Sequence, residues 1–141
     1  MEIRPVKASD QIAITELLHV ALSSYQPDAA QLSFFWKRFI GQSGLYARVA
    51  DIEGKIVGFG VLLVEHKIRG GRLGHIEDIV VAADARKAGI GRAIVSELCQ
   101  IAADEGCYTI SLACADHNID FYRNCGFGVD GVSMSCRPTA W

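Results

Sequence analysis

A glycine-bearing basic turn is the stretch of this sequence whose residue types are best suited to bind a ligand. Arg86, Lys87 and Arg92 bring positive charge, while Gly89 and Gly91 remove side chains where a ligand would approach the backbone. A helix is predicted to begin within this turn. The first turn of a helix leaves about four backbone N–H groups without partners and carries a partial positive charge. These features together predict a binding site for a diphosphate.

Two common nucleotide-binding patterns do not fit this turn. Ile94 stands where the fingerprint G-x-G-x-x-G needs its third glycine, and the G-K-[ST] of a P-loop does not follow. The pattern present is R-x-x-G-x-G, which resembles the turn that holds the pyrophosphate of acetyl-CoA in the GCN5-related N-acetyltransferase superfamily. That resemblance implies cofactor contacts along the whole turn from Arg86 to Arg92, Ala88 and Ile90 included.

The elements that must position this turn follow from hydrophobic periodicity and turn residues. Apolar residues at three- and four-residue steps predict a helix over 90–105, after a buried strand over 75–81. Further strands are predicted over 2–6, 45–50, 55–67, 108–114 and 129–137, and further helices from Ser9 or Asp10 to Leu22, over 28–40 and over 118–124. The order β-α-α-β-β-β-α-β-α-β indicates a mixed α/β fold in a single domain over residues 1–141.

Composition narrows the class of protein. Half of the residues are hydrophobic, 21% are charged and the net charge is −2, which argues against a nucleic-acid-binding domain. The longest apolar stretch, over 56–64, is far shorter than the roughly 18 residues of a membrane span. No signal-like apolar run follows the first residues, so we expect a cytoplasmic protein, with import into an organelle left open. The five cysteines include no C-x-x-C pair, so we expect reduced thiols and no metal site.

A longer part of the chain, roughly residues 55–137, resembles the glucosamine-6-phosphate N-acetyltransferase family of that superfamily. The matching segments are L-L-V-E-H-K at 62–67, G-H-I-E-D-I-V-V at 74–81, G-C-Y at 106–108 and C-x-x-x-N-x-x-F-Y-x-x-C-G-F at 114–127. The resemblance implies the acyl-CoA N-acyltransferase fold, an α/β fold with a mixed, centrally splayed sheet. It also implies a homodimer with shared active sites.

The activity implied by this resemblance is transfer of an acetyl group from acetyl-CoA to the 2-amino group of glucosamine 6-phosphate. The reaction would proceed by direct attack in a ternary complex, on the route to UDP-N-acetylglucosamine. A strand N–H near Ile79 can stabilise the oxyanion that forms, and a tyrosine in a dry pocket can protonate the leaving sulfur. No metal is expected to take part.

Individual roles carried over from the family fall on matching positions. The resemblance assigns Glu77, Asp78 and Tyr122 to catalysis, with the two carboxylates also holding the amino sugar. Being adjacent on a strand, Glu77 and Asp78 are expected to point to opposite faces. The remaining implied contacts are Ile79, Val80, Val81, Asn118, Phe121 and Tyr122 with the cofactor, and Ser23, Lys67, Tyr108, Thr109 and Arg137 with the substrate. Lys67 and Arg137 would face the sugar phosphate.

The chain departs from the family pattern at Ala113, where the family has an acidic residue in contact with the substrate amine. Asp78, backbone carbonyls near Glu77 or a water molecule would then have to orient and deprotonate the amine. Two other functions stay open, an acetyltransferase for another small-molecule or protein amine and a non-catalytic acyl-CoA-binding module. His75 and the other three histidines are expected to be surface or structural residues.

Overall fold

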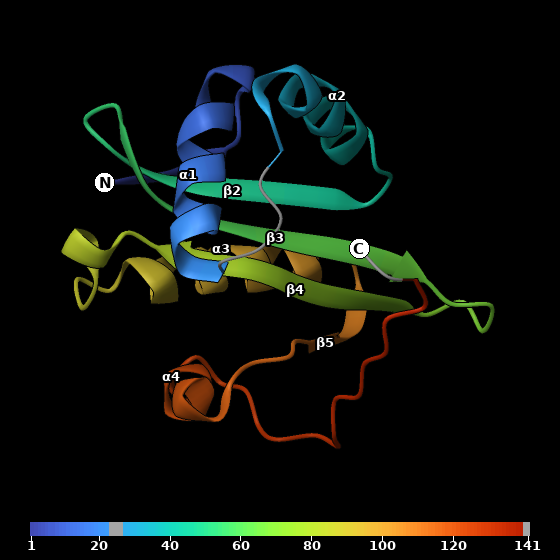
Figure 1. Cartoon of the computed structure of the whole chain (residues 1–141). Helices are drawn as coiled ribbons and strands as arrows, with labels where there is room; N and C mark the ends of the chain where they lie inside the picture. Colours follow the sequence, from blue (N-terminus) through green and yellow to red (C-terminus); the bar gives the residue numbers. More distant parts are fainter. Residues whose placement is uncertain (23–26, 140–141) are drawn as a thin grey trace.

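A computed structural model describes residues 1–22 and 27–139, so the predicted substrate contact Ser23 lies outside the described residues. Five strands form one sheet in the order β1-β2-β3-β4-β5 (Figure 1). Their bounds are β1 Glu2–Pro5, β2 Leu45–Ile52, β3 Lys55–His66, β4 Arg72–Val81 and β5 Cys107–Ser111. The pairs are antiparallel except for β4 with β5, which run parallel. The predicted mixed sheet is therefore confirmed.

Helices cover both faces of this sheet. Helices α1 (Gln11–Leu22) and α2 (Ala29–Ile40) lie on one face, α3 (Ile90–Asp104) lies on the other, and α4 (Ile119–Asn124) follows β5 (Figure 1). The core on the α3 face is formed by Ala50, Val57, Leu62, Ile76, Ile90, Ile94, Val95, Leu98 and Ala102. The core on the α1 face is formed by Ile14, Ala47, Val49, Phe59, Val61 and Val80, with Trp36 and Phe39 packed against it. No helix of the described ranges is long and apolar enough to cross a membrane.

Local signals placed most element boundaries within a few residues. Helix α2 begins as predicted, because the Asp28 carboxylate accepts a hydrogen bond from the backbone N–H of Gln31 at 2.8 Å and caps the helix. Asp10 does not cap α1 in this way. It ends a short 3₁₀ turn over Ala8–Asp10, and its carboxylate instead accepts a hydrogen bond from the Lys7 backbone N–H at 2.7 Å.

The strand predicted over 129–137 is wrong. This segment pairs with no strand among the described residues and runs outside the sheet (Figure 1). Its apolar side chains Val132 and Met134 are 90% and 92% exposed. Their alternating spacing is typical of a strand, but a strand also needs a neighbour for its backbone hydrogen bonds. The described part of a single chain supplies none.

Within the stretch over which the two strands pair, β4 has one residue more than β3. The register places Asp78 and Ile79 together opposite Gly60, and Asp78 has a φ of 54°, in the left-handed region. This is a β-bulge, at which the alternation of faces is broken. Ile76 and Ile79, three positions apart, accordingly contact the same core. Strict alternation therefore does not apply at Glu77 and Asp78.

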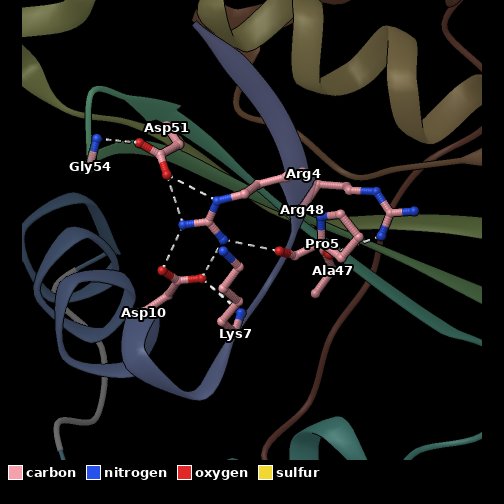
Figure 2. Close-up of polar contacts among 8 residues, drawn as sticks. All are labelled: Arg4, Pro5, Lys7, Asp10, Ala47, Arg48, Asp51 and Gly54. Atoms are coloured by element: carbon pink, nitrogen blue, oxygen red, sulfur yellow. Dashed lines mark hydrogen bonds and ion pairs between the residues drawn. The ribbon is translucent and has the colours of Figure 1, made fainter.

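A cluster of three charged residues fixes the N-terminal strand against the rest of the fold (Figure 2). Arg4 donates to both carboxylate oxygens of Asp10, at 2.8 and 2.9 Å, and through Nε to Asp51 Oδ2 at 3.0 Å. The side chains of Arg4 and Asp10 are only 11% and 5% exposed. The Arg4 guanidinium lowers the pKa of both carboxyls. At Asp51 a hydrogen bond from the Gly54 backbone N–H lowers the pKa further.

Candidate active site

The candidate site lies where β4 and β5 separate. Their parallel pairing stops at the His75–Ser111 pair, where β5 ends. Strand β4 continues to Val81, and no strand of the described ranges flanks it on that side. The backbone N–H and C=O groups of 77–81 that point away from β3 can therefore bond to a ligand beside the strand, although Arg86 Nε already donates to the Val81 carbonyl at 3.4 Å. This is the edge predicted to contact the cofactor through Ile79, Val80 and Val81.

The predicted diphosphate turn lies just beyond the end of this edge. Gly89 precedes α3 with a φ of 78°, a conformation that glycine adopts without strain. The four residues 86–89 are exposed, so their cationic side chains and backbone face solvent. The first intrahelical bond runs from the Ala93 N–H to the Gly89 carbonyl at 3.0 Å. The N–H groups of residues 90–92 thus have no partner further back in the helix and can bind an anion.

Gly91 permits close packing between the start of α3 and α4. A β-carbon at this position would lie 3.2 Å from Cζ of Phe121 and 3.5 Å from Cγ2 of Val81. The Phe121 ring in turn packs edge-on against Tyr122, with 4.9 Å between centroids, and Tyr122 packs against Phe127 at 6.0 Å. The glycine of the turn and the predicted catalytic tyrosine therefore belong to one packed unit.

A cleft of about 910 Å³ opens beside the point where the two strands separate. It brings together the predicted site residues Glu77, Tyr108, Thr109 and Tyr122, together with Ala113. Its other wall is the exposed segment over 128–133. The predicted residues Asp78, Lys67, Asn118 and Arg137 do not line this cleft. The structure thus assembles part of the predicted substrate set in one cleft, and Asp78, Lys67 and Arg137 lie outside its lining.

Two titratable groups at the site have perturbed acidity. Desolvation raises the pKa of the Tyr122 phenol, and the nearby thiols of Cys114 and Cys125 add to the effect. The phenol therefore stays protonated at neutral pH and can act as a proton donor. Desolvation also raises the pKa of the Asp78 carboxyl, which forms no ion pair in residues 1–22 and 27–139.

The structure of one chain does not bring the two predicted phosphate-binding residues, Lys67 and Arg137, into one cleft. Lys67 forms an ion pair with Glu65, with 2.9 Å between Nζ and Oε1. Arg137 is exposed in the C-terminal segment and has no ion pair with the described part of the chain. Asn118 is also exposed, at the start of α4.

A chain of polar side chains that the sequence did not single out crosses the sheet next to the cleft. Glu65 Oε1 lies 3.0 Å from His75 Nε2, and His75 Nδ1 lies 3.3 Å from Ser111 Oγ. Strand alternation could have indicated their shared face, because His75 precedes Glu77 by two residues and Ser111 follows Thr109 by two. Sequence alone could not show that these two strand positions meet.

The family follows from a match over most of the chain. Residues 12–127 match the model of the Acetyltransferase (GNAT) family. This chain belongs to the GNAT family. The predicted fold class is confirmed with it, because the crystal structure of glucosamine-6-phosphate N-acetyltransferase from Arabidopsis thaliana superposes with a TM-score of 0.89. That match covers 98% of both chains at 27% identity.

Curated relatives of this GNAT protein point to a narrower group. The glucosamine 6-phosphate N-acetyltransferase of Candida albicans is 37% identical over 91 residues, which make up 63% of this chain and 61% of the relative. The enzyme of that name from Trypanosoma brucei brucei is 43% identical over 76 residues, 52% of each chain. The aligned part therefore spans between half and three-fifths of the relatives' own length.

Membership of the GNAT family implies acetyl-CoA as the acetyl donor, and the residues present suit that ligand. The open edge of β4 offers hydrogen bonds to an extended pantetheine arm. The exposed cations of the turn and the free N–H groups of α3 offer partners to a diphosphate. Within the described ranges there is no group of three or more His, Cys, Asp or Glu side chains arranged to hold a metal ion.

Proposed function

We propose that this protein transfers the acetyl group of acetyl-CoA to the 2-amino group of glucosamine 6-phosphate. The observation that carries the proposal is the open edge of β4 beside a cleft lined by Glu77, Thr109 and Tyr122. Glu77 and Tyr122 lie in segments that resemble the glucosamine-6-phosphate N-acetyltransferases, and Thr109 directly follows another of these segments. The named activity of the curated relatives supports the same substrate.

The residues around the cleft account for the chemistry of a direct attack in a ternary complex. Pairing of the donor's pantetheine with residues 79–81 would place the thioester where β4 and β5 separate. The amine nitrogen forms a bond to the thioester carbonyl carbon, and a backbone N–H of β4 stabilises the oxyanion. When the C–S bond breaks, the Tyr122 phenol donates a proton to the sulfur, and the excess proton on nitrogen passes to a carboxylate or to water.

The substrate is tested by offering acetyl-CoA with a panel of amines and following the release of free thiol. We expect glucosamine 6-phosphate to react faster than glucosamine, free lysine or peptide amines. Ala113 supplies no carboxylate to the amine, so a different acceptor is the main alternative. Faster reaction of another amine would identify that amine as the substrate instead. Acetyl-CoA binding without thiol release from any amine would instead indicate a non-catalytic module.

Replacing Tyr122 with phenylalanine is expected to lower kcat about tenfold and to leave acetyl-CoA binding unchanged, because the ring packing is retained. The loss is modest for acid catalysis, since a thiolate of pKa about 8.5 is already a fair leaving group. Steady-state kinetics measure the change in kcat, and calorimetric titration measures the affinity for acetyl-CoA. A phenylalanine variant with the parental kcat would show that water or the amine protonates the sulfur.

We propose further that the protein acts as a homodimer with shared sites. The segment after residue 128 exposes Val132 and Met134 and forms one wall of the cleft without pairing in the described chain. Strand β5 is the last in the sheet order, so no strand of residues 1–22 and 27–139 pairs with its outer edge. Exposed apolar side chains next to an unpaired strand edge favour burial against a second copy. Such a dimer would bring the partner's Arg137 to a site that contains Lys67.

If Lys67 and Arg137 bind the sugar phosphate, Lys67→Ala is expected to raise KM for glucosamine 6-phosphate about ten- to a hundredfold, the value of one charge-assisted contact. Activity on unphosphorylated glucosamine should barely change. The exposed Lys37 of α2 provides a matched control, since Lys37→Ala removes the same charge away from the cleft. Equal losses on both sugars would point to a folding defect.

Mixing chains tests whether the site is shared. A Lys67→Ala chain and an Arg137→Ala chain form heterodimers in which one of the two sites keeps both cations. Random assortment is then expected to restore about a quarter of the parental activity. Mixing two samples of the same variant restores none. No recovery from the mixed variants would place both residues of each site in one chain.

A further inference from the structure

We propose that Ser111 binds a ring hydroxyl next to the amino group of the acceptor sugar, and that His75 and Glu65 hold Ser111 in the orientation this contact requires. The proposal rests on the proposed function and extends it by naming residues that recognise the sugar ring itself. Ser111 and His75 line the cleft with Glu77 and Tyr122. They have no part in the catalytic steps described above.

The three residues form a continuous chain of hydrogen bonds across three strands. His75 of β4 lies directly opposite Ser111 of β5 in the parallel register, with 3.3 Å between Nδ1 and Oγ. On its other side His75 reaches Glu65 of β3, with 3.0 Å between Nε2 and Oε1. Lys67 closes the far end of the chain through its ion pair with the same carboxylate oxygen of Glu65.

The chemistry of these groups fixes the direction of each hydrogen bond. Lys67, and then His75, hold the pKa of the Glu65 carboxyl below its usual value, so Glu65 is ionised and can only accept. The Nε2–H of His75 must therefore donate to Glu65. In a neutral imidazole the other nitrogen, Nδ1, is then an acceptor, and the Ser111 hydroxyl donates its proton to it. The lone pairs of Ser111 are left as acceptors for a donor in the cleft.

The position of Ser111 suits a hydroxyl of the sugar ring. Ser111 pairs with His75, which lies two residues before Glu77, about 7 Å along the strand. Under the proposed function the amine reacts beside Glu77 and Tyr122, which share the cleft with Ser111, and Lys67, the proposed phosphate contact, lies at the opposite end of the hydrogen-bonded series. A sugar ring that spans these two ends would pass over Ser111. Its hydroxyls at C1 and C3, which flank the amino carbon, are the nearest donors to the reacting nitrogen.

The contact is tested with Ser111→Ala and with analogues of glucosamine 6-phosphate that lack the C1 or the C3 hydroxyl. In the parent, we expect one of the two analogues to lose about three- to tenfold in kcat/KM, the value of one neutral hydrogen bond. Ser111→Ala should show a similar loss on the full sugar and no further loss on that analogue. Equal losses on the analogues in parent and variant would overturn the contact.

The positioning role of His75 is tested with two amide replacements. The side-chain amide of His75→Asn takes the place of Nδ1 and can still accept from Ser111, whereas that of His75→Gln takes the place of Nε2 and can reach only Glu65. We expect His75→Asn to keep a KM near the parental value and His75→Gln to behave like Ser111→Ala. When each is combined with Ser111→Ala, the difference between them should disappear. A difference that persists without Ser111 would show that His75 acts by another route.

The affinity for acetyl-CoA, measured by calorimetry, serves as the check on folding and should be the same in every variant. The outcomes also separate this inference from the proposed function. A parent protein that does not acetylate glucosamine 6-phosphate overturns both. An active parent whose kinetics are unaffected by Ser111→Ala overturns only the role of Ser111, and the proposed function stands.

Discussion

Replacing Gly91 with valine is expected to weaken acetyl-CoA binding by about ten- to a hundredfold, the loss of one charge-assisted contact. A β-carbon at this position meets Phe121 at 3.2 Å, so the branched side chain must push α4 away or shift the start of α3. Movement of α3 displaces the N–H groups that would receive the diphosphate, and movement of α4 displaces Asn118 and Phe121, which are predicted to contact the cofactor. Calorimetric titration with acetyl-CoA measures the loss directly, without any need for turnover.

Two controls separate this effect from general damage to α3. Ser96 is exposed on the same helix away from the turn, so Ser96→Val introduces an equally branched residue and should leave binding unchanged. S-acetylpantetheine lacks the diphosphate, so Gly91→Val should reduce its reaction much less than it reduces the reaction of acetyl-CoA. Parental affinity for acetyl-CoA in Gly91→Val would remove the diphosphate from this turn.

Replacing Arg4 with methionine is expected to cost about 3 kcal/mol of folding free energy, the lower end of the range for breaking a buried ion pair. Methionine keeps much of the apolar volume of arginine, but the Asp10 carboxylate is left 5% exposed without its partner. Urea denaturation of the two proteins measures the difference. Lys55→Met is the matched control, because the ion pair of Lys55 with Asp84 is exposed and its removal should leave the midpoint unchanged.

The same cluster predicts how stability depends on pH. Arg4 lowers the pKa of Asp10 and of Asp51 in the folded state, so the folded protein binds fewer protons there than the unfolded chain. The stabilisation is present above the unfolded pKa of about 3.9 and is lost as the pH falls through the folded pKa values. Arg4→Met should flatten this acid dependence. A variant whose stability falls as steeply as that of the parent in acid would assign the effect to other carboxylates.

The parts of the fold that could be predicted from sequence are those set by local patterns. Apolar spacing placed α3 to within one residue, and Asp28 marked the start of α2 through a side-chain cap that acts over three residues. The turn with Gly89 and Gly91 could be recognised because glycine is the residue type that its backbone conformation and close packing require. The edge of β4 could be anticipated only through the family resemblance, since nothing local indicates where β5 ends.

The features that were missed depend on contacts between distant parts of the chain. Residues 129–137 have the alternation of a strand, but whether they form one depends on a neighbour that local sequence does not reveal. Asp10 was expected to cap its own helix, whereas its carboxylate accepts two hydrogen bonds from Arg4, six positions earlier. His75 and Ser111 are 36 positions apart and become partners only through the parallel register of β4 and β5.

The bulge at Asp78 decides which face of the sheet each later side chain of β4 lies on. Because side chains alternate with a period of two, one inserted residue reverses the phase of the strand from Ile79 onward. Loss of a single codon within 77–79 would remove the extra residue, restore regular alternation and leave Val80 on the α1 face opposite Phe59. Loss of a codon within 73–75, where the pairing is regular, would instead reverse the faces of the residues that precede it in the strand. The bulge is thus a place at which the strand that offers its edge to the donor can lose a residue and keep its core side chains in place.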